Sequence, residues 1–243
     1  MTDLLYFPDN EYEEDFEATV SANGTAGGTD FVVLDRTLFY KEGGGQPADH
    51  GLLSWDSSRA DVIDVRKDHG DIKHFLDGDA PREGVTVTGR IDWERRYNHM
   101  RMHTAQHLVS WVVLQEYDAV TAGNQIHEDE SRIDFNPVSF DDEDVAFVEE
   151  RVNECIQEDL DVSKTMIARD EVEKRVQDGR TNLDLIPDSV DPLRVVIIGD
   201  DDLCPCGGTH VSSLGELGEF SVLTTENKGA DTERVRFTLH DDH

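Results

Sequence analysis

The amino-acid sequence predicts an α+β protein of two domains, in which a small β-barrel is followed by an α+β domain. Two observations support this prediction. Short stretches of alternating apolar and polar residues recur in positions 1–90, and from Asp92 onward the apolar residues recur with the 3.6-residue period of a helix. The domain boundary is therefore expected near residue 90, which gives domains 1–90 and 91–243.

The first domain contains four strand candidates, at residues 16–20, 30–34, 60–65 and 85–89. Asn23–Gly24 and Gly27–Gly28 are typical turn pairs between the first two strands. Several short strands at this spacing favour a small barrel. The stretch Phe39–Gly51 contains three consecutive glycines followed by Gln-Pro, and it is predicted to be a loop whose bare backbone can approach another surface closely.

The second domain is predicted to begin with a long helix that is capped by Asp92, starts at Trp93 and ends near Ala122–Asn124. Asp141 is predicted to cap a second helix, in which Cys155 lies beside the apolar face and is expected to be a core residue. The remaining expected elements are strands at 131–135, 162–168 and 193–198, a short helix at 170–177, and a hairpin of residues 220–225 and 235–239 joined by 226–230.

The formal net charge of −32 is extreme, with 54 Asp and Glu against 22 Lys and Arg. The acids are spread along the whole chain and apolar runs such as Leu193–Ile198 recur, which indicates a folded protein with an acidic surface rather than a disordered chain. Such a surface suits a cytoplasm at molar salt, where the screening length falls to ~3 Å. The composition therefore predicts a halophilic protein.

The cysteine count and the N-terminal sequence bear on the compartment. Three cysteines are present, and two of them are one residue apart, so no disulfide framework is implied. The N-terminus does not show a basic stretch followed by an apolar one, and no segment approaches the ~20 apolar residues that span a bilayer. A cytoplasmic protein with no membrane partner is expected.

Two distant motifs predict a metal site. His103 and His107 are four residues apart, a spacing that places both imidazoles on one face of the expected helix. Cys206 and His210 are also four apart and enclose Gly207–Gly208, a turn that directs both side chains the same way. Three histidines and a cysteine suit Zn²⁺. One zinc ion per chain is therefore predicted, in a zinc-binding α+β domain.

Residue types exclude several classes of zinc enzyme. The residues between His103 and His107 are Thr, Ala and Gln, so the glutamate base of the His-Glu-x-x-His peptidases is absent. The cytidine deaminase pattern also lacks its glutamate and its second cysteine. Cys204 lies two residues before Cys206 and competes with it as a ligand candidate, but the Cys-x3-His spacing favours Cys206.

Three motifs occur in order along the chain: Phe39–Gly51, His103–Leu108 and Cys206–Val211. With these motifs the chain resembles, over nearly its whole length, the free-standing alanyl-tRNA editing proteins of the AlaX family, medium-size type, which are similar to the editing domain of alanyl-tRNA synthetase. The resemblance implies that the zinc-binding domain is an editing domain. It also implies an ATP-independent aminoacyl-tRNA deacylase that removes serine, or glycine, from mischarged alanine tRNA.

The resemblance further implies roles for individual residues. The family's zinc ligands match His103, His107, Cys206 and His210. Its substrate-binding positions match Thr104, Gln46, Gly43, Gly44 and Gly45, with Thr104 bonding the serine hydroxyl. The alternative for Thr104 is a hydrogen bond to the carbonyl one turn back, and the alternative for Gln46 is an amide that stabilises its own loop. No residue is identified as the general base.

An acidic protein is expected to contact tRNA through a few placed cations, namely Arg95, Arg96, Arg101 and Lys228. At molar salt counterion release contributes little, so shape and hydrogen bonds must carry recognition. No DNA partner is expected. Two other functions stay open at this point, a non-catalytic zinc-stapled RNA-binding module and a metal-dependent hydrolase of a small ester or amide.

Overall fold

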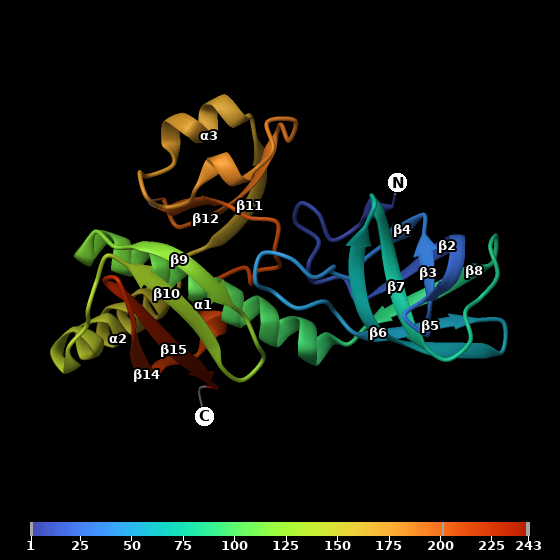
Figure 1. Ribbon diagram of the computed structural model, residues 1–243, viewed down its shortest axis with the longest axis horizontal. Helices are drawn as coiled ribbons and strands as arrows, with labels where there is room; N and C mark the ends of the chain where they lie inside the picture. The colour runs from blue at the N-terminus through green and yellow to red at the C-terminus, as the bar shows by residue number, and fades with distance from the viewer. Residues whose placement is uncertain (1, 201, 242–243) are drawn as a thin grey trace. The chain divides into compact units, whose positions relative to one another are not determined.

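The computed structural model describes residues 2–200 and 202–241 (Figure 1). Its contacts divide the chain into two compact units, Met1–Tyr97 and Asn98–His243. The division falls inside helix α1 (Trp93–Tyr117), whose first residues belong to the first unit. The architecture is mixed, with a β-rich first unit and a second unit of helices and sheets, which confirms the α+β fold class.

The first unit is a closed barrel, as the sequence predicted. Around the barrel the strands run in the order β2 (Asp15–Ala26), β3 (Thr29–Leu34), β7 (Asp71–Asp77), β6 (Ser58–Asp68), β5 (Gly51–Trp55) and β8 (Thr86–Ile91). All neighbouring strands are antiparallel. Two short strands, β1 (Asp3–Leu4) and β4 (Arg36–Thr37), form a separate parallel pair.

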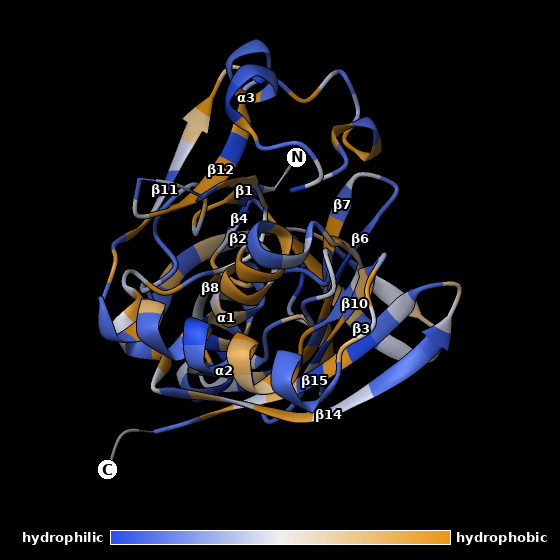
Figure 2. Ribbon diagram, turned by 90° about the vertical axis from the view of Figure 1, so that its left-hand side faces the viewer, coloured by the Kyte–Doolittle hydropathy of each residue, from blue (hydrophilic) through white to orange (hydrophobic). Residues whose placement is uncertain are grey.

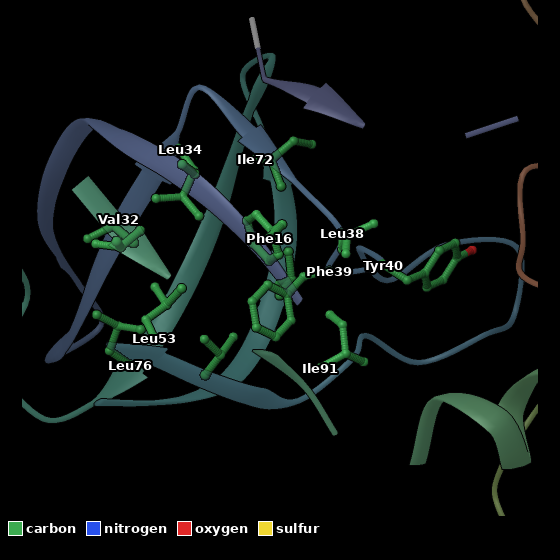
Figure 3. Packing of buried hydrophobic residues seen from close by; sticks show 14 of the residues in the cluster. Phe16, Val32, Leu34, Leu38, Phe39, Tyr40, Leu53, Ile72, Leu76 and Ile91 are labelled. Carbon is green, nitrogen blue, oxygen red and sulfur yellow. The ribbon is translucent and has the colours of Figure 1, made fainter. Parts of the chain in front are cut away.

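The barrel interior is filled by alternate residues of its strands (Figure 3). Along β8 every second side chain is buried, which is the period expected of a strand with one face in a core. Gly89 lies on this inner face, and a Cβ there would lie 2.3 Å from the ring of Phe16. A glycine is therefore required at this position, because the Phe16 ring occupies the space of a side chain.

Two details of the predicted first unit were wrong. Asn23–Gly24 does not form a turn, because β2 continues through it and the hairpin turn lies at Gly27–Gly28. Both of those glycines have positive φ, +62° and +88°, a conformation that glycine adopts at no steric cost. Strands β5 and β7 were not predicted.

Helix α1 begins at Trp93 as predicted, and Asp92 Oδ1 accepts a hydrogen bond from the Arg95 N–H at 3.3 Å. The predicted end near residues 122–124 was wrong, because the helix stops at Tyr117. Asp118 has a left-handed φ of +53°, which ends the helix. The residues that follow form strand β9 (Val120–Gln125), which pairs with β10 (Ser131–Asn136).

The second long helix, α2 (Asp142–Gln157), confirms the cap predicted at Asp141. Asp141 Oδ1 accepts hydrogen bonds from two backbone N–H groups, and the Asp144 carboxylate accepts from the Asp141 N–H in return. Cys155 is buried, as expected of a core residue. The helix packs on β14 (Glu219–Gly229), where the Asn153 amide bonds both backbone groups of Phe220 at 2.9 Å.

Two sheets complete the second unit. The first has the strand order β14, β15 (Thr232–His240), β10, β9, and it contains the predicted hairpin, whose turn lies at Ala230–Asp231 rather than across 226–230. The second sheet consists of β11 (Val162–Ile167), β12 (Leu193–Ile198) and β13 (Asp202–Pro205). Short helix α3 (Arg169–Arg175) packs on this sheet through the buried Val172 and is otherwise hydrophilic (Figure 2).

Two 3-10 turns, Leu183–Leu185 and Leu214–Leu217, lie in the connections of the second unit. Among the described residues, no helix combines the length and the apolar character that crossing a membrane requires.

Candidate metal centre

The first half of the metal site lies on the buried middle of α1. His103 and His107 are 2% and 4% exposed, and their ring centroids are 5.2 Å apart. The four-residue spacing places them one turn apart on one face of the helix, as predicted. The surrounding residues Met102–Ser110 are all buried, so the helix itself holds both rings in place.

The second half lies in the loop that follows β13. The Cys206 N–H donates to Arg194 O at 3.2 Å, and the Gly208 N–H points back to the Cys206 Sγ at 3.3 Å. His210 is fully buried, and its ring lies 4.4 Å from that of His103 and 4.6 Å from that of His107. The loop thus brings a thiol and an imidazole onto the histidine face of α1.

The four side chains converge on one point. Cys206 Sγ lies 3.6 Å from His103 Nε2 and 3.4 Å from His210 Nε2. One ligand atom from each of the four residues lies within 4.8 Å of all the others. Ligand atoms bound to a tetrahedral zinc are about 3.3–3.8 Å apart, given Zn–N near 2.0 Å and Zn–S near 2.3 Å. The cluster of His103, His107, Cys206 and His210 could therefore hold a single metal ion.

The protonation of the cluster also suits a metal. Burial, with a smaller contribution from the Arg194 charge, lowers the pKa of His103 to about 3. Burial likewise lowers the pKa values of His107 and His210 well below 6.5. Neutral imidazoles offer a lone pair to an ion. Among the described residues, the buried His107 Nδ1 has no hydrogen-bond partner, which is unusual for an interior polar atom unless an ion or a water meets it.

Thr104 lies inside this arrangement and its hydroxyl is engaged. Oγ1 donates to Met100 O at 2.8 Å, which is the bond to the carbonyl one turn back that the sequence left open. The same oxygen accepts from the Val211 N–H at 3.2 Å. It also lies 3.1 Å from His210 Nδ1. A hydroxyl has one donor and two acceptor sites, so these three partners saturate Thr104 when His210 Nδ1 carries a hydrogen.

Cys204 is not part of the cluster. It is buried, and that burial raises the pKa of its thiol to about 12, which disfavours the thiolate that binds metals. Its Sγ contacts Pro205 O at 3.8 Å. Of the two neighbouring cysteines, only Cys206 contacts the clustered histidines.

The glycine-rich loop belongs to the first unit. Gly43 and Gln46 exchange two backbone hydrogen bonds, of 3.1 and 3.0 Å, across Gly44 and Gly45. These two glycines have φ of +60° and +85°, the values of a turn that favours glycine. The Tyr40 hydroxyl donates to Gly43 O at 2.8 Å and fixes the start of the turn. Gln46 is 1% exposed, and a Cβ on Gly44 would meet no atom within 4 Å.

The four cations expected to contact tRNA have different surroundings. Arg96 is fully buried and bonds the carboxylate of Asp49 and two backbone carbonyls. A guanidinium held in this way is not accessible to a phosphate, so the tRNA contact expected of Arg96 is not proposed. Arg95 is partly buried, with Nε on Ala48 O at 3.1 Å.

The other two cations are in the second unit. Arg101 is 12% exposed and pairs with Asp241 at 2.7 Å. Lys228 is 41% exposed and lies 3.5 Å from Glu226. Of the four, Lys228 therefore has the most accessible charge, beside an acid that reduces its local effect.

Three buried cations near the cluster were missed from the sequence: Lys164, Arg180 and Arg194. A signal for one of them existed, because Arg194 interrupts the apolar run Leu193–Ile198, where a charge needs a specific partner. Lys164 and Arg180 lie in stretches with ordinary charge patterns, and nothing local marks them.

Comparison with known proteins gives the family. Residues 10–95 match the class II (A) tRNA synthetases, and residues 193–236 match the threonyl and alanyl tRNA synthetase second additional domain. The alanyl-tRNA editing protein AlaX-M of Methanosarcina barkeri is 41% identical over 249 residues, which cover 99% of this chain and 100% of that protein. The chain belongs to the alanyl-tRNA editing protein family.

Other relatives show how this editing protein compares with longer chains. The alanyl-tRNA editing protein AlaX-L of Pyrococcus horikoshii is 39% identical over 212 residues, covering 85% of this chain and 50% of that one. The alanine–tRNA ligase of Methanopyrus kandleri is 37% identical over 240 residues, covering 96% of this chain and 26% of the ligase. The match to AlaX-M is thus end to end, and the match to the ligase covers about a quarter of that enzyme.

Proposed function

We propose that this protein is a trans-editing deacylase that hydrolyses seryl-tRNA, and glycyl-tRNA, made on alanine tRNA. The observation that carries the proposal is the buried cluster of three histidines and one cysteine, in a chain that matches two alanyl-tRNA editing proteins of the AlaX-M type over 98–100% of their length. No membrane-spanning helix is found in the described part of the chain, and we propose that the enzyme acts in the cytoplasm.

The chemistry explains why such an activity is needed. Serine differs from alanine by one hydroxyl, and a synthetase pocket rejects such a near-isostere by only ~10²-fold. A second site that bonds the hydroxyl discriminates far better, because the smaller substrate leaves buried polar groups unpaired. In the reaction, water oxygen bonds to the carbonyl carbon of the aminoacyl ester and the bond to the ribose oxygen breaks. The ribose oxygen receives a proton, and free serine and intact tRNA result.

We propose that the ion is Zn²⁺, held by His103, His107, Cys206 and His210. Thiolate with imidazole is a donor set that zinc prefers over magnesium or calcium. When bound, zinc would polarise the ester carbonyl or orient the substrate. A catalytic zinc usually has three protein ligands and an open position. Polarisation of the carbonyl would therefore require one of the four residues to leave the ion, whereas an ion held by all four would only orient the substrate. No residue is assigned to the proton transfers.

The substrate-binding residues are part of the proposal as well. Gln46 and the turn formed by Gly43, Gly44 and Gly45 are proposed to approach the aminoacyl end, where a bare backbone offers N–H and C=O groups. Thr104 remains a proposed contact of the serine hydroxyl, but its Oγ1 would have to give up one of its three present partners to make that bond. Arg95, Arg101 and Lys228 are proposed tRNA contacts.

A deacylation assay tests the function. Purified protein with zinc, in molar KCl, is incubated with seryl-tRNA or alanyl-tRNA made on alanine tRNA, and with a free serine ester. We expect rapid loss of serine from tRNA and slow loss of alanine, and no activity in a His103→Ala control. Binding of tRNA without hydrolysis would favour an RNA-binding module, and equal hydrolysis of the free ester would favour a small-ester hydrolase.

A further inference from the structure

Three buried cations surround the metal-binding cluster. Lys164 on β11, Arg180 after α3 and Arg194 on β12 are 6%, 6% and 5% exposed. Burying a charge is unfavourable unless hydrogen bonds replace its lost hydration. The hydrogen-bond partners of these three side chains therefore indicate their structural role.

Arg194 holds the loop that contains Cys206. Its Nη1 donates to Cys206 O at 2.7 Å and to Gly208 O at 2.9 Å. Its own backbone carbonyl accepts from the Cys206 N–H at 3.2 Å. One residue thus bonds both backbone groups of the proposed cysteine ligand, which fixes the direction in which Sγ points.

Arg180 holds the helix that contains His107. Its Nη2 donates to His107 O at 3.1 Å, and Nε and Nη2 bond the two oxygens of Asp202 at 2.6 and 2.8 Å. Asp202 is the first residue of β13, the strand that leads to Cys206. Through this pair the helical half of the cluster is tied to the strand that carries the other half.

Lys164 makes the third contact, which is longer. Its Nζ lies 3.5 Å from His210 O and 3.3 Å from Val211 O. Three of the carbonyls bonded by the cations therefore belong to clustered residues, namely Cys206, His107 and His210, and the other two belong to Gly208 and Val211 of the same loop. Fixed, planar donors such as guanidinium lose little freedom on bonding, so they suit this task.

We propose that Lys164, Arg180 and Arg194 are positioning residues that hold the metal ligands in their binding geometry through backbone carbonyls. The proposal rests on the proposed zinc site. It explains why the small sheet β11–β12–β13 is present beside α1: its cations brace a helix and a loop whose metal-binding residues are about a hundred positions apart. Holding ligands in place before the ion arrives reduces the ordering that binding must supply.

The experiment measures metal affinity rather than activity. Wild type, Arg194→Gln and Arg194→Lys are stripped of metal, and zinc dissociation constants are obtained by competition with a chromophoric chelator in molar KCl. Arg175→Gln is the matched control, because Arg175 lies on the nearby α3 and makes an exposed pair with Glu171 at 3.1 Å. Loss of groups that support metal ligands weakens binding by about 10- to 100-fold. We expect that range for Arg194→Gln, a smaller loss for Arg194→Lys, and a change within about twofold for Arg175→Gln.

Two further readings separate positioning from general stability. Circular dichroism melts of the metal-free proteins show whether each variant folds, and Co²⁺ spectra report ligand geometry at the site. A folded Arg194→Gln protein with an altered cobalt spectrum and weaker zinc binding supports the proposal. Folded Arg194 variants that bind zinc as the wild type does would overturn it. If Arg194→Gln does not fold, Arg194→Lys decides by the same criteria, since it keeps the charge and loses the planar fork.

Failure of the underlying zinc site has a different signature. Wild-type protein that binds neither zinc nor cobalt would refute the metal part of the proposed function. Wild-type binding that all the Arg194 variants retain would refute only the positioning role.

Discussion

Thr104 and His210 are 106 positions apart in the sequence, yet Thr104 Oγ1 lies 3.1 Å from His210 Nδ1. The other nitrogen of the same ring, Nε2, faces Cys206 Sγ at 3.4 Å. If Nε2 binds the ion, Nδ1 carries the hydrogen, and this N–H donates a hydrogen bond to Thr104 Oγ1. The hydroxyl then has every bond it can make, which sets both the tautomer and the orientation of the ring.

This relationship predicts the effect of Thr104→Val. Valine preserves the volume but leaves the His210 Nδ1–H and the Val211 N–H buried without an acceptor, at roughly 1–3 kcal/mol for each group. We expect zinc binding about tenfold weaker or worse, and near wild-type binding in Thr104→Ser, which keeps the hydroxyl. Chelator competition measures both. Unchanged zinc affinity in Thr104→Val, with a reduced preference for seryl- over alanyl-tRNA, would instead favour direct contact with the serine hydroxyl.

The two neighbouring cysteines should respond differently to removal. Cys206 Sγ lies among the histidine nitrogens, whereas the buried Cys204 thiol has its pKa raised to about 12 and contacts a backbone carbonyl. Cys206→Ser should therefore lose most of the bound zinc, and Cys204→Ser should retain it. Metal analysis of the purified proteins after dialysis against a weak chelator tests the assignment. The reverse pattern would show that the wrong cysteine was assigned.

The sequence predicted the features that depend on local spacing. The caps Asp92 and Asp141 precede their helices directly, and the histidine pair and the Cys-x3-His motif each lie within five residues. Strand β7 was not predicted because one of its inward-facing residues, His74, is polar. The alternation of apolar and polar residues that includes Ile72 and Leu76 is therefore interrupted in the sequence.

Long-range partners could not be predicted in this way. The Arg180 contact to His107 spans 73 positions, and the Thr104 contact to His210 spans 106. These contacts exist because the fold brings β13 and α1 together. The spacing of apolar residues along the sequence carries no information about that packing. The burial of Arg96 was not predicted for a related reason. A cation in the first turn of a helix is normally exposed, but Arg96 is buried and bonds Asp49.

A pH dependence of stability follows from His74 in the barrel. The ring is fully buried, with Nε2 2.9 Å from Thr37 Oγ1, and burial lowers its pKa from 6.5 to about 4. Between these two values the unfolded chain binds more protons than the folded one, so stability rises with pH across the interval. The contribution of His74 to the free energy of unfolding is fully present above pH 6.5. It falls by roughly 3 kcal/mol as the pH drops to 4.

The test of this dependence compares wild type with His74→Gln in urea titrations between pH 4 and 7 in molar KCl. The glutamine cannot titrate, so the variant should show a shallower decline, while groups outside the barrel contribute equally to both proteins. Parallel curves for the two proteins would contradict the assignment to His74.

The net charge of −32 predicts a dependence on salt. The screening length grows from ~3 Å at 1 M to ~10 Å at 0.1 M, so the like charges of the surface repel over a longer range as salt is removed. We expect the melting temperature to fall steeply below a few tenths molar KCl, with unfolding or association at the lowest salt. Circular dichroism across a KCl series gives the answer. A melting temperature that stays constant down to low salt would refute the halophilic interpretation.

The bare turn of the glycine-rich loop can be tested against a matched glycine. Gly44 and Gly27 have φ of +60° and +62°, both lie in the first unit, and a Cβ on either would meet no atom within 4 Å. Gly44→Ala and Gly27→Ala should therefore destabilise the protein alike, by about 1–2 kcal/mol for a left-handed alanine. If the turn approaches the aminoacyl end of the substrate, only Gly44→Ala should also lower kcat/KM on seryl-tRNA, by about tenfold or more, because the added methyl occupies the space the substrate needs.

Melting temperatures establish the equal loss of stability, and deacylation rates are then compared at a temperature where both variants are fully folded. Equal kcat/KM for the two variants would show that the turn is an element of the barrel and does not contact the substrate.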